Sequence, residues 1–336
     1  MGSQFVDFNA DGHLDYLSAT FDGSPHISYG SKEGFSPPER LKDADGQRIL
    51  ISSFWNYEDK AHQKTGRSMA DGKPRGERCI SALAFDWDDD GDYDLLLGSY
   101  EKGHIYLQMN EGTKTDAKFT GKNIPVMAGE KPFGLPSKMT TPKLVDWDSD
   151  GDLDLIAGTF SDAYQSEGQG GGVYLSVNEG EVGAPKFGPV EELIAPVSLG
   201  GTEPQRPDLG LYPDPADHDG DGDLDLIVGG YSSWTPSPRE LSGLEELRVE
   251  ELTNELEVLE EEQTALYDAF SADLEEATAG LDSESEEYEE RSDEVRDKHL
   301  GGLREMSDKM RAAQEELDEL VPKPKRKSFV WLYERL

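Results

Sequence analysis

The sequence lacks several features that define large classes of protein. It has a single cysteine, Cys79, in 336 residues, which excludes an internal disulfide framework and any cysteine-based zinc or iron–sulfur site. No apolar run approaches the roughly 20 residues of a membrane span. GxSxG, HExxH and P-loop motifs are missing. We therefore expect no membrane span and, with no catalytic constellation recognised, no enzyme.

Basic residues are also scarce. Lys and Arg total 32 against 71 Asp and Glu, a net charge of −39, and the pI is about 4.3. Such a surface repels phosphate backbones and anionic lipids, so we expect no nucleic-acid partner, and it attracts cations. The 36 glycines, 13 tyrosines and 12 phenylalanines are nevertheless not the composition of a disordered chain.

What the sequence does contain is a repeat. Four segments share the nine-residue pattern D-x-[DN]-x-D-G-x-x-D, namely Asp7–Asp15, Asp86–Asp94, Asp146–Asp154 and Asp217–Asp225. Their first residues lie 79, 60 and 71 positions apart. An apolar stretch precedes each segment, and an apolar run with glycine follows it, as in LLLGSY after Asp94. The period and the shared flanks indicate a repeat architecture.

The flanks predict β-strands. Alternating β-branched and aromatic residues with Gly/Asn/Glu turns are typical of strands rather than helices. A third strand begins near His26, His104 and Gly172, and a fourth is expected around Phe35, Phe119 and Phe187. Each unit of about 60–80 residues is therefore predicted to be strand, acidic loop and three further strands.

The acidic loop has the chemistry of a calcium site. Carboxylates at loop positions 1, 3, 5 and 9 would repel one another without a cation. Ca²⁺ takes six to eight oxygens at about 2.3–2.6 Å, whereas Mg²⁺ gives up its water reluctantly and is less favoured. Glycine at position 6 permits the turn, position 7 offers its carbonyl, and position 9 can chelate with both oxygens.

An EF-hand is rejected, because it needs a glutamate at loop position 12 and flanking helices. Position 12 is Ser18, Leu97, Ala157 or Val228 in the four segments. Each of these residues lies in a strand-like run.

On these motifs the chain resembles the FG-GAP/VCBS repeat family of calcium-binding β-propellers, which includes the integrin α-subunit head. The resemblance covers residues 5–235 and a short tail, and it implies about four Ca²⁺ ions. The implied side-chain ligands are Asp7, Asn9, Asp11 and Asp15; Asp86, Asp88, Asp90 and Asp94; Asp146, Asp148, Asp150 and Asp154; and Asp217, Asp219, Asp221 and Asp225. His13, Asp92, Asp152 and Asp223 are implied as backbone-carbonyl ligands. Asn9 removes one charge, so the first site is predicted to be the weakest.

The resemblance also implies a function. We expect a non-enzymatic, calcium-binding β-propeller that displays a surface for a protein or glycan partner outside the cell or at its surface, as in cell adhesion. The alternative is a calcium-dependent propeller hydrolase or lyase acting on polysaccharide. Because no signal segment precedes Phe5, we expect a shortened form of a longer exported protein with a further blade or strand before Phe5.

The composition changes after Pro238. Residues 240–321 hold 29 acidic and 7 basic residues, a net charge of −22. Apolar residues recur at three- and four-residue spacing, which predicts an antiparallel coiled-coil hairpin turning at Ala279–Ser283. The predicted seam is Val249, Leu252, Leu256, Leu259, Gln263, Leu266 and Phe270, facing Val295, His299, Gly302, Met306, Met310, Ala313, Leu317 and Leu320.

The segment after the hairpin resembles the third strand of the other units, since Val330, Trp331 and Leu332 align with Ile105, Tyr106 and Leu107. The fold class is thus all-β, a propeller of four recognisable blades with the hairpin inserted in the last blade. We assign residues 1–238 to blades one to four, 239–322 to the hairpin and 323–336 to the return strand. The hairpin is either an interaction element, including for self-association, or a solvated insertion.

Three further features are ambiguous from sequence. The segment Ile51–Arg78 is polar and locally basic, which suits a ligand-contacting loop or a flexible connection. Trp87 and Trp147, at loop position 2, suit packing between blades better than carbohydrate stacking. Cys79 suits a buried thiol better than a nucleophile.

Overall fold

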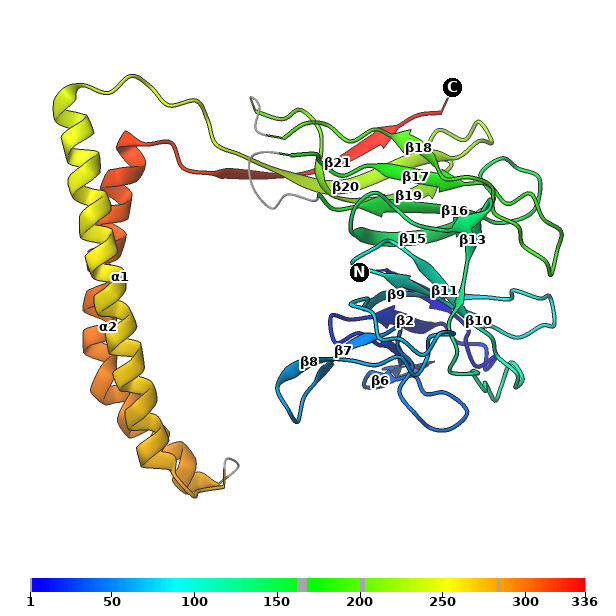
Figure 1. Ribbon diagram of the computed structural model, residues 1–336, viewed down its shortest axis with the longest axis horizontal. Helices are drawn as coiled ribbons and strands as arrows, with labels where there is room; N and C mark the ends of the chain where they lie inside the picture. Colours follow the sequence, from blue (N-terminus) through cyan, green and yellow to red (C-terminus); the bar gives the residue numbers. More distant parts are fainter. Residues whose placement is uncertain (1, 162–167, 200–202, 283–284, 336) are drawn as a thin grey trace. The chain divides into compact units, whose positions relative to one another are not determined.

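The computed structural model describes residues 2–161, 168–199, 203–282 and 285–335. The chain is mostly β-sheet with two helices (Figure 1). It divides into two compact units, one of Met1–Trp234 with Arg326–Leu336 and the other of Thr235–Lys325.

The first unit contains four antiparallel sheets that follow one another in chain order. The first is β1 (Ser3–Val6), β2 (Asp15–Ala19), β3 (Pro25–Ser28) and β6 (Glu39–Arg40). The second is β9 (Cys79–Phe85), β10 (Asp94–Ser99), β11 (Ile105–Gln108) and β12 (Ile124–Pro125). The third is β15 (Met139–Val145), β16 (Asp154–Thr159), β17 (Val173–Ser176) and β18 (Glu191–Ile194). The fourth is β19 (Leu209–Ala216), β20 (Asp225–Trp234) and β21 (Lys325–Tyr333).

Three two-stranded ribbons lie on the connections between these strands. They are β4 (Gly30–Ser31) with β5 (Gly34–Phe35), β7 (Ser53–Asn56) with β8 (Ala61–Lys64), and β13 (Met127–Ala128) with β14 (Lys131–Pro132). The segment 51–78, which was ambiguous from sequence, contains the β7–β8 ribbon.

The sheets are held together by three cores, one between each pair of successive sheets. Strand β10 is apolar at every position from Leu95 to Leu97, and does not alternate between apolar and polar residues, because both of its faces are buried. Leu95 and Leu97 pack into the core shared with the first sheet, while Leu96 packs into the core shared with the third. Side chains alternate between the two faces of a strand, so a strand buried on both faces must be apolar throughout. No closed ring of sheets is detected in the described ranges.

The outer strand of the first three sheets does not lie where the sequence predicted it. The prediction placed it around Phe35, Phe119 and Phe187, whereas the outer strands are β6, β12 and β18. Phe119 and Phe187 are buried and form only isolated bridges, and Phe35 lies in the β4–β5 ribbon. Phe119 and Phe187 therefore belong to the hydrophobic cores and not to an outer strand.

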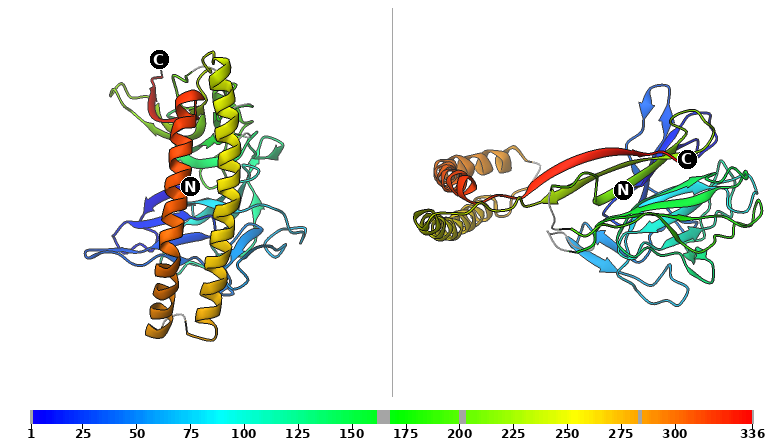
Figure 2. Two further views of the ribbon diagram at one scale, coloured as in Figure 1. Left: turned by 90° about the vertical axis from the view of Figure 1, so that its left-hand side faces the viewer. Right: turned by 90° about the horizontal axis from the view of Figure 1, so that it is seen from above.

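The second unit consists of α1 (Gly243–Thr278) and α2 (Glu286–Leu320). They lie side by side along their lengths in both views (Figure 2). They run antiparallel, since Arg248 near the start of α1 binds Glu316 near the end of α2, and Asp273 binds His299. A capping box of Ser242 and Glu245 begins α1.

The helices pack through part of the predicted seam. Leu252 and Leu259 of α1 are buried, as are Val295, Met306 and Ala313 of α2. Ser283, the last residue of the predicted turn, lies outside the described residues. Neither described helix carries an apolar stretch of membrane-spanning length.

Candidate metal centre

The four acidic loops share an unusual backbone conformation. Loop position 4 has a positive φ of 55°, 58°, 64° and 80° at Ala10, Asp89, Ser149 and Gly220. Loop position 6 has a φ of 89°, 93°, 98° and 98° at Gly12, Gly91, Gly151 and Gly222. A Cβ on Gly91 would meet nothing within 4 Å. Glycine is therefore required at position 6 by its conformation and not by lack of space.

This conformation turns backbone N–H groups toward the carboxylates. The position-5 carboxylate accepts a hydrogen bond from the position-7 N–H in every loop, at 2.9–3.1 Å. The position-1 carboxylate accepts from the position-6 N–H in the first three loops. In the fourth loop Asp217 accepts instead from Gly220 at 2.7 Å. The loops are thus held with their acidic side chains converging.

Three loops bring three carboxylates into one cluster, in each of which single oxygens lie within 4.8 Å of one another. The clusters are Asp86, Asp88 and Asp90; Asp146, Asp148 and Asp154; and Asp217, Asp219 and Asp221. Oxygens bound to one Ca²⁺ at 2.3–2.6 Å lie up to about 5 Å apart. The donor set and its spacing therefore fit a calcium ion, and all nine residues are among the predicted ligands.

Loop position 7 carries an aspartate with an unpaired buried oxygen in three of the described loops. Asp92, Asp152 and Asp223 each have a buried Oδ1 without a hydrogen-bond partner in the part of the chain that the structure describes. Burial, followed by the charges of neighbouring aspartates, raises the pKa of all three. Buried oxygens with no donor are destabilising unless a cation neutralises them. The family resemblance had assigned only backbone carbonyls to these positions.

Position 9 has a role that the sequence analysis missed. Its carboxylate is buried in every loop, and each of its two oxygens accepts a backbone N–H. One N–H comes from loop position 2 of the same loop. The other comes from the residue two positions after the third strand: Gly30 to Asp15, Asn110 to Asp94, Asn178 to Asp154 and Arg335 to Asp225. Position 9 therefore fastens the loop to the end of the third strand of its own sheet.

The pKa values of two position-9 carboxylates are shifted in opposite directions by their surroundings. Burial raises the pKa of Asp94 to about 6, against the lowering effect of its two backbone hydrogen bonds. The pKa of Asp225 is instead lowered, chiefly by the Arg335 N–H. The same backbone arrangement thus holds a carboxyl group that ionises readily in one loop and with difficulty in another.

The first loop departs from the others. Asp7, Asp11 and Asp15 form no triplet among the described residues, and the Asn9 amide donates to the Asp11 carboxylate at 3.1 Å. Its backbone geometry is nevertheless that of the other loops. Its predicted weakness as a calcium site stays a prediction.

The aromatic residues at position 2 and the lone cysteine serve packing. Trp87 meets Phe85 and Phe187, with ring centroids 6.1 and 6.2 Å away. Trp147 is buried, and the Arg335 guanidinium lies 4.8 Å from its ring centroid. Cys79 is fully buried, which raises the pKa of its thiol and confirms the prediction of a buried rather than reactive cysteine.

Comparison with known protein families gives a match that spans the second and third acidic loops. The family model described as an FG-GAP-like repeat matches residues 86–157, which extend from the second acidic loop through the third into β16. The chain therefore carries an FG-GAP-like repeat and matches the FG-GAP/VCBS repeat family in this region. The first and fourth loops lie outside the matched residues and share the same nine-residue pattern. A search of curated proteins gave no match.

Proposed function

We propose that the first unit is a β-propeller braced by calcium that binds a partner without catalysing a reaction. The single observation that carries this proposal is the recurrence of converging aspartates at equivalent loop positions in three sheets. Four similar sheets packed in chain order support the propeller architecture. In this arrangement calcium serves folding, because ion binding to the native loops adds directly to the stability of the folded state.

Calcium is proposed over magnesium for all four loops, which would give about four Ca²⁺ ions. Magnesium demands a near-ideal octahedron and keeps its water, whereas these loops offer many oxygens on a flexible turn. Calcium sites of extracellular modules typically have dissociation constants of about 10⁻⁴–10⁻³ M. The proposal therefore places this unit outside the cell or at its surface, where it would bind a protein or a glycan.

Calcium titration of the purified chain tests the proposal. Calorimetry should show about four sites, and EGTA should lower the melting temperature. Calcium present at 100 times a site's dissociation constant stabilises the fold by about 2.7 kcal/mol per site. Fewer than three sites, or a melting temperature that ignores EGTA, would contradict the proposal.

A matched pair of variants assigns the effect to the second loop. Asp90→Asn removes a charged oxygen of the cluster, while Asp89→Asn makes the same charge change at position 4, outside that cluster. We expect Asp90→Asn to lose one calcium site and most of the calcium-dependent stabilisation of that loop. Asp89→Asn should titrate like the parent, since asparagine tolerates the positive φ at this position.

We further propose that the second unit is a coiled coil that associates with a second copy of itself. Leu244, Leu247 and Val258 of α1 are exposed and fall on one side of the helix by their spacing. Sedimentation of the chain should show a dimer that strengthens with salt, because salt screens the acidic helices. The double variant Leu247→Gln/Val258→Gln should be monomeric. A parent chain that is monomeric at every salt concentration would exclude self-association.

The enzymatic alternative makes a different prediction. A calcium-dependent hydrolase or lyase would release new reducing ends, or unsaturated ends absorbing near 235 nm, from a polysaccharide. We expect neither product from a panel of neutral and acidic polysaccharides incubated with calcium. A product whose formation requires calcium would replace the binding proposal.

A further inference from the structure

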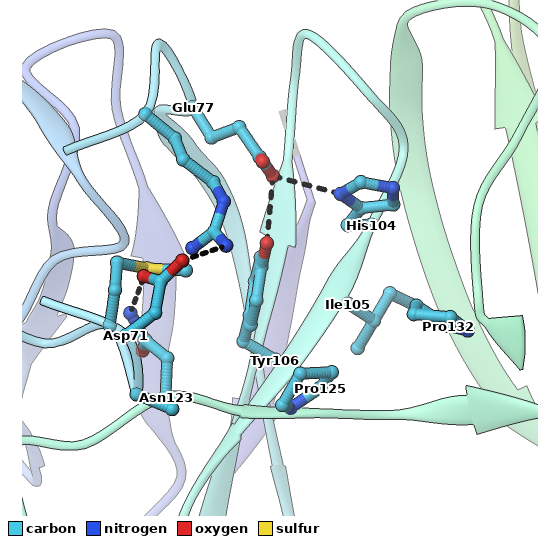
Figure 3. A pocket seen from close by; sticks show the side chains of 11 residues that line it. Asp71, Glu77, His104, Ile105, Tyr106, Asn123, Pro125 and Pro132 are labelled. Carbon is cyan, nitrogen blue, oxygen red and sulfur yellow. Dashed lines mark hydrogen bonds and ion pairs between the residues drawn. The ribbon is translucent and has the colours of Figure 1, made fainter. Parts of the chain in front are cut away.

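A cavity of about 230 Å³ lies away from the acidic loops. The segment 51–78 forms one side of it through Asp71, Arg75 and Glu77, while His104 and Tyr106, at the start of β11, form another (Figure 3). Its apolar wall consists of Met69, Ile105, Pro125 and Pro132. The cavity thus combines polar groups with an apolar surface, as small-molecule sites do.

A buried carboxylate organises the polar side. Glu77 is 5% exposed, and its Oε2 accepts hydrogen bonds from His104 Nδ1 and the Tyr106 hydroxyl, each at 3.1 Å. Burial raises the pKa of Glu77, but the hydrogen bond and charge of His104, with the hydrogen bonds from Tyr106 and Ser99, lower it overall. Glu77 is therefore an ionised acceptor. An ionised carboxylate cannot donate, so Nδ1 of His104 carries the proton in this hydrogen bond, and Nε2 is the ring nitrogen left for a ligand.

A second charged pair lies beside it. The guanidinium of Arg75 binds the Asp71 carboxylate at 3.0 Å, and both side chains are about two-fifths exposed, at 40% and 43%. The cavity therefore offers donors on Arg75 and acceptors on Asp71, while the Glu77 carboxylate is already bound by His104 and Tyr106. An anionic ligand would face Asp71 and Glu77, and a cationic ligand would face Arg75. This balance favours an uncharged ligand that both donates and accepts hydrogen bonds.

The first sheet contains a histidine–carboxylate pair of a different kind, in which His26 belongs to the third strand. There His26 lies 3.5 Å from the Asp22 carboxylate, which also binds Arg40 and Arg48 at 2.9 and 3.3 Å. The His26 side chain is 15% exposed, against 33% for His104. Beside the second sheet, Arg75 pairs with Asp71 rather than with Glu77, and His104 lines the cavity.

We propose that this cavity binds one ring of a neutral sugar. A pyranose has an apolar C–H face for the Ile105, Pro125 and Pro132 wall, and hydroxyl groups that form hydrogen bonds with His104 Nε2, donate to Asp71 and accept from Arg75. The volume lies below the roughly 300 Å³ at which sites for larger small molecules begin, which suits a single ring. The inference rests on the proposed function, because it names the ligand of the binding unit.

The test uses the whole chain with calcium and the methyl glycosides of glucose, galactose, mannose, fucose and N-acetylglucosamine as probes. Saturation-transfer NMR should detect binding of at least one probe, and calorimetry should give its affinity. Arg75→Ala and His104→Ala should each weaken that binding about tenfold, the equivalent of one hydrogen bond of about 1.4 kcal/mol. His26→Ala, which removes a carboxylate-bound histidine outside the cavity, should leave the affinity within about twofold.

Three results would overturn the inference. The first is that the folded chain binds none of the methyl glycosides. The second is that binding survives in both cavity variants. The third is that the chain prefers methyl glucuronide or glucosamine to the neutral rings. Melting curves of each variant separate lost binding from lost folding. If Asp90→Asn and Asp89→Asn titrate calcium alike while the sugar still binds, the calcium proposal fails and the cavity assignment holds.

Discussion

The backbone N–H of Arg335 donates to the Asp225 carboxylate at 2.9 Å across 110 residues of sequence. The same bond joins Gly30 to Asp15, Asn110 to Asp94 and Asn178 to Asp154 in the other sheets. The chain therefore leaves the fourth sheet after β20, forms two long helices, and returns with β21 to the position that the repeat prescribes. In all four sheets, the same backbone hydrogen bond therefore joins the acidic loop to the end of the third strand.

Removing this hydrogen bond should destabilise the first unit. Arg335→Pro deletes the N–H and leaves a buried oxygen of Asp225 unsatisfied, at a cost of about 2 kcal/mol. Arg335→Ala keeps the N–H and controls for the lost guanidinium over Trp147. Urea unfolding in saturating calcium should give a lower midpoint for the proline variant than for the alanine variant. Equal midpoints would show that the bond contributes nothing.

The same substitution should have opposite effects at two glycines. Gly91→Ala forces alanine into a φ of 93° and should destabilise the first unit by about 1–2 kcal/mol. Gly301→Ala lies within α2, where a Cβ meets nothing within 4 Å. It should stabilise the helical unit by about 0.5–1 kcal/mol. Separate unfolding transitions, followed by tryptophan fluorescence and by circular dichroism at 222 nm, measure both effects.

Deleting Thr235–Lys325 and joining the ends with a short Gly/Ser linker should leave the first unit folded, because β20 and β21 belong to one sheet. The helical signal should disappear, while calcium binding and the β-type spectrum remain. An insoluble product, or one without calcium binding, would mean that the helices are needed for the sheets to fold.

Acid should weaken the buried Asp22 cluster. Burial raises the pKa of Asp22, but hydrogen bonds from Arg40 and Thr20, with the charges of His26 and Arg48, lower it overall. A carboxylate with a lowered pKa stabilises the fold above its unfolded pKa of about 3.9, and that stabilisation is lost as the pH falls through the lower folded value. The stability difference between the parent and Asp22→Asn should be constant above about pH 5 and shrink below about pH 4.

An exposed carboxylate provides the control for this pH series. Asp116 pairs with Lys118 at the surface, where an ion pair contributes little. Asp116→Asn should therefore match the parent at every pH. A difference for Asp22→Asn that does not change between pH 3 and pH 6 would contradict the electrostatic role of Asp22.

Local pattern predicted the acidic loops well, because their geometry depends on residues within nine positions. The glycine at position 6 and the alternate carboxylates specify the turn and its internal hydrogen bonds. The inner strands were predictable for a similar reason, since runs such as Leu95–Leu97 must be buried on two faces.

Features that depend on long-range packing were not predictable. The strand β12 has two residues, one of them proline, and such a segment has almost no propensity signal. Glu77 and His104 are 27 positions apart, and only the packing of segment 51–78 against β11 brings them together. No local pattern marks this pair, because the acidic residue shortly before His104 in the sequence is Glu101 and not Glu77.

The double burial of β10 also governs how the first unit unfolds. Its side chains belong alternately to two cores, and Leu155 and Ile156 divide β16 between two cores in the same way. Unfolding of one sheet would expose to water the core that it shares with the neighbouring sheet. The loss of that core would destabilise the neighbouring sheet, and so on along the chain. Nearest-neighbour coupling of this kind makes a repeat array lose its structure in a concerted transition, with the end sheets as the points where fraying begins.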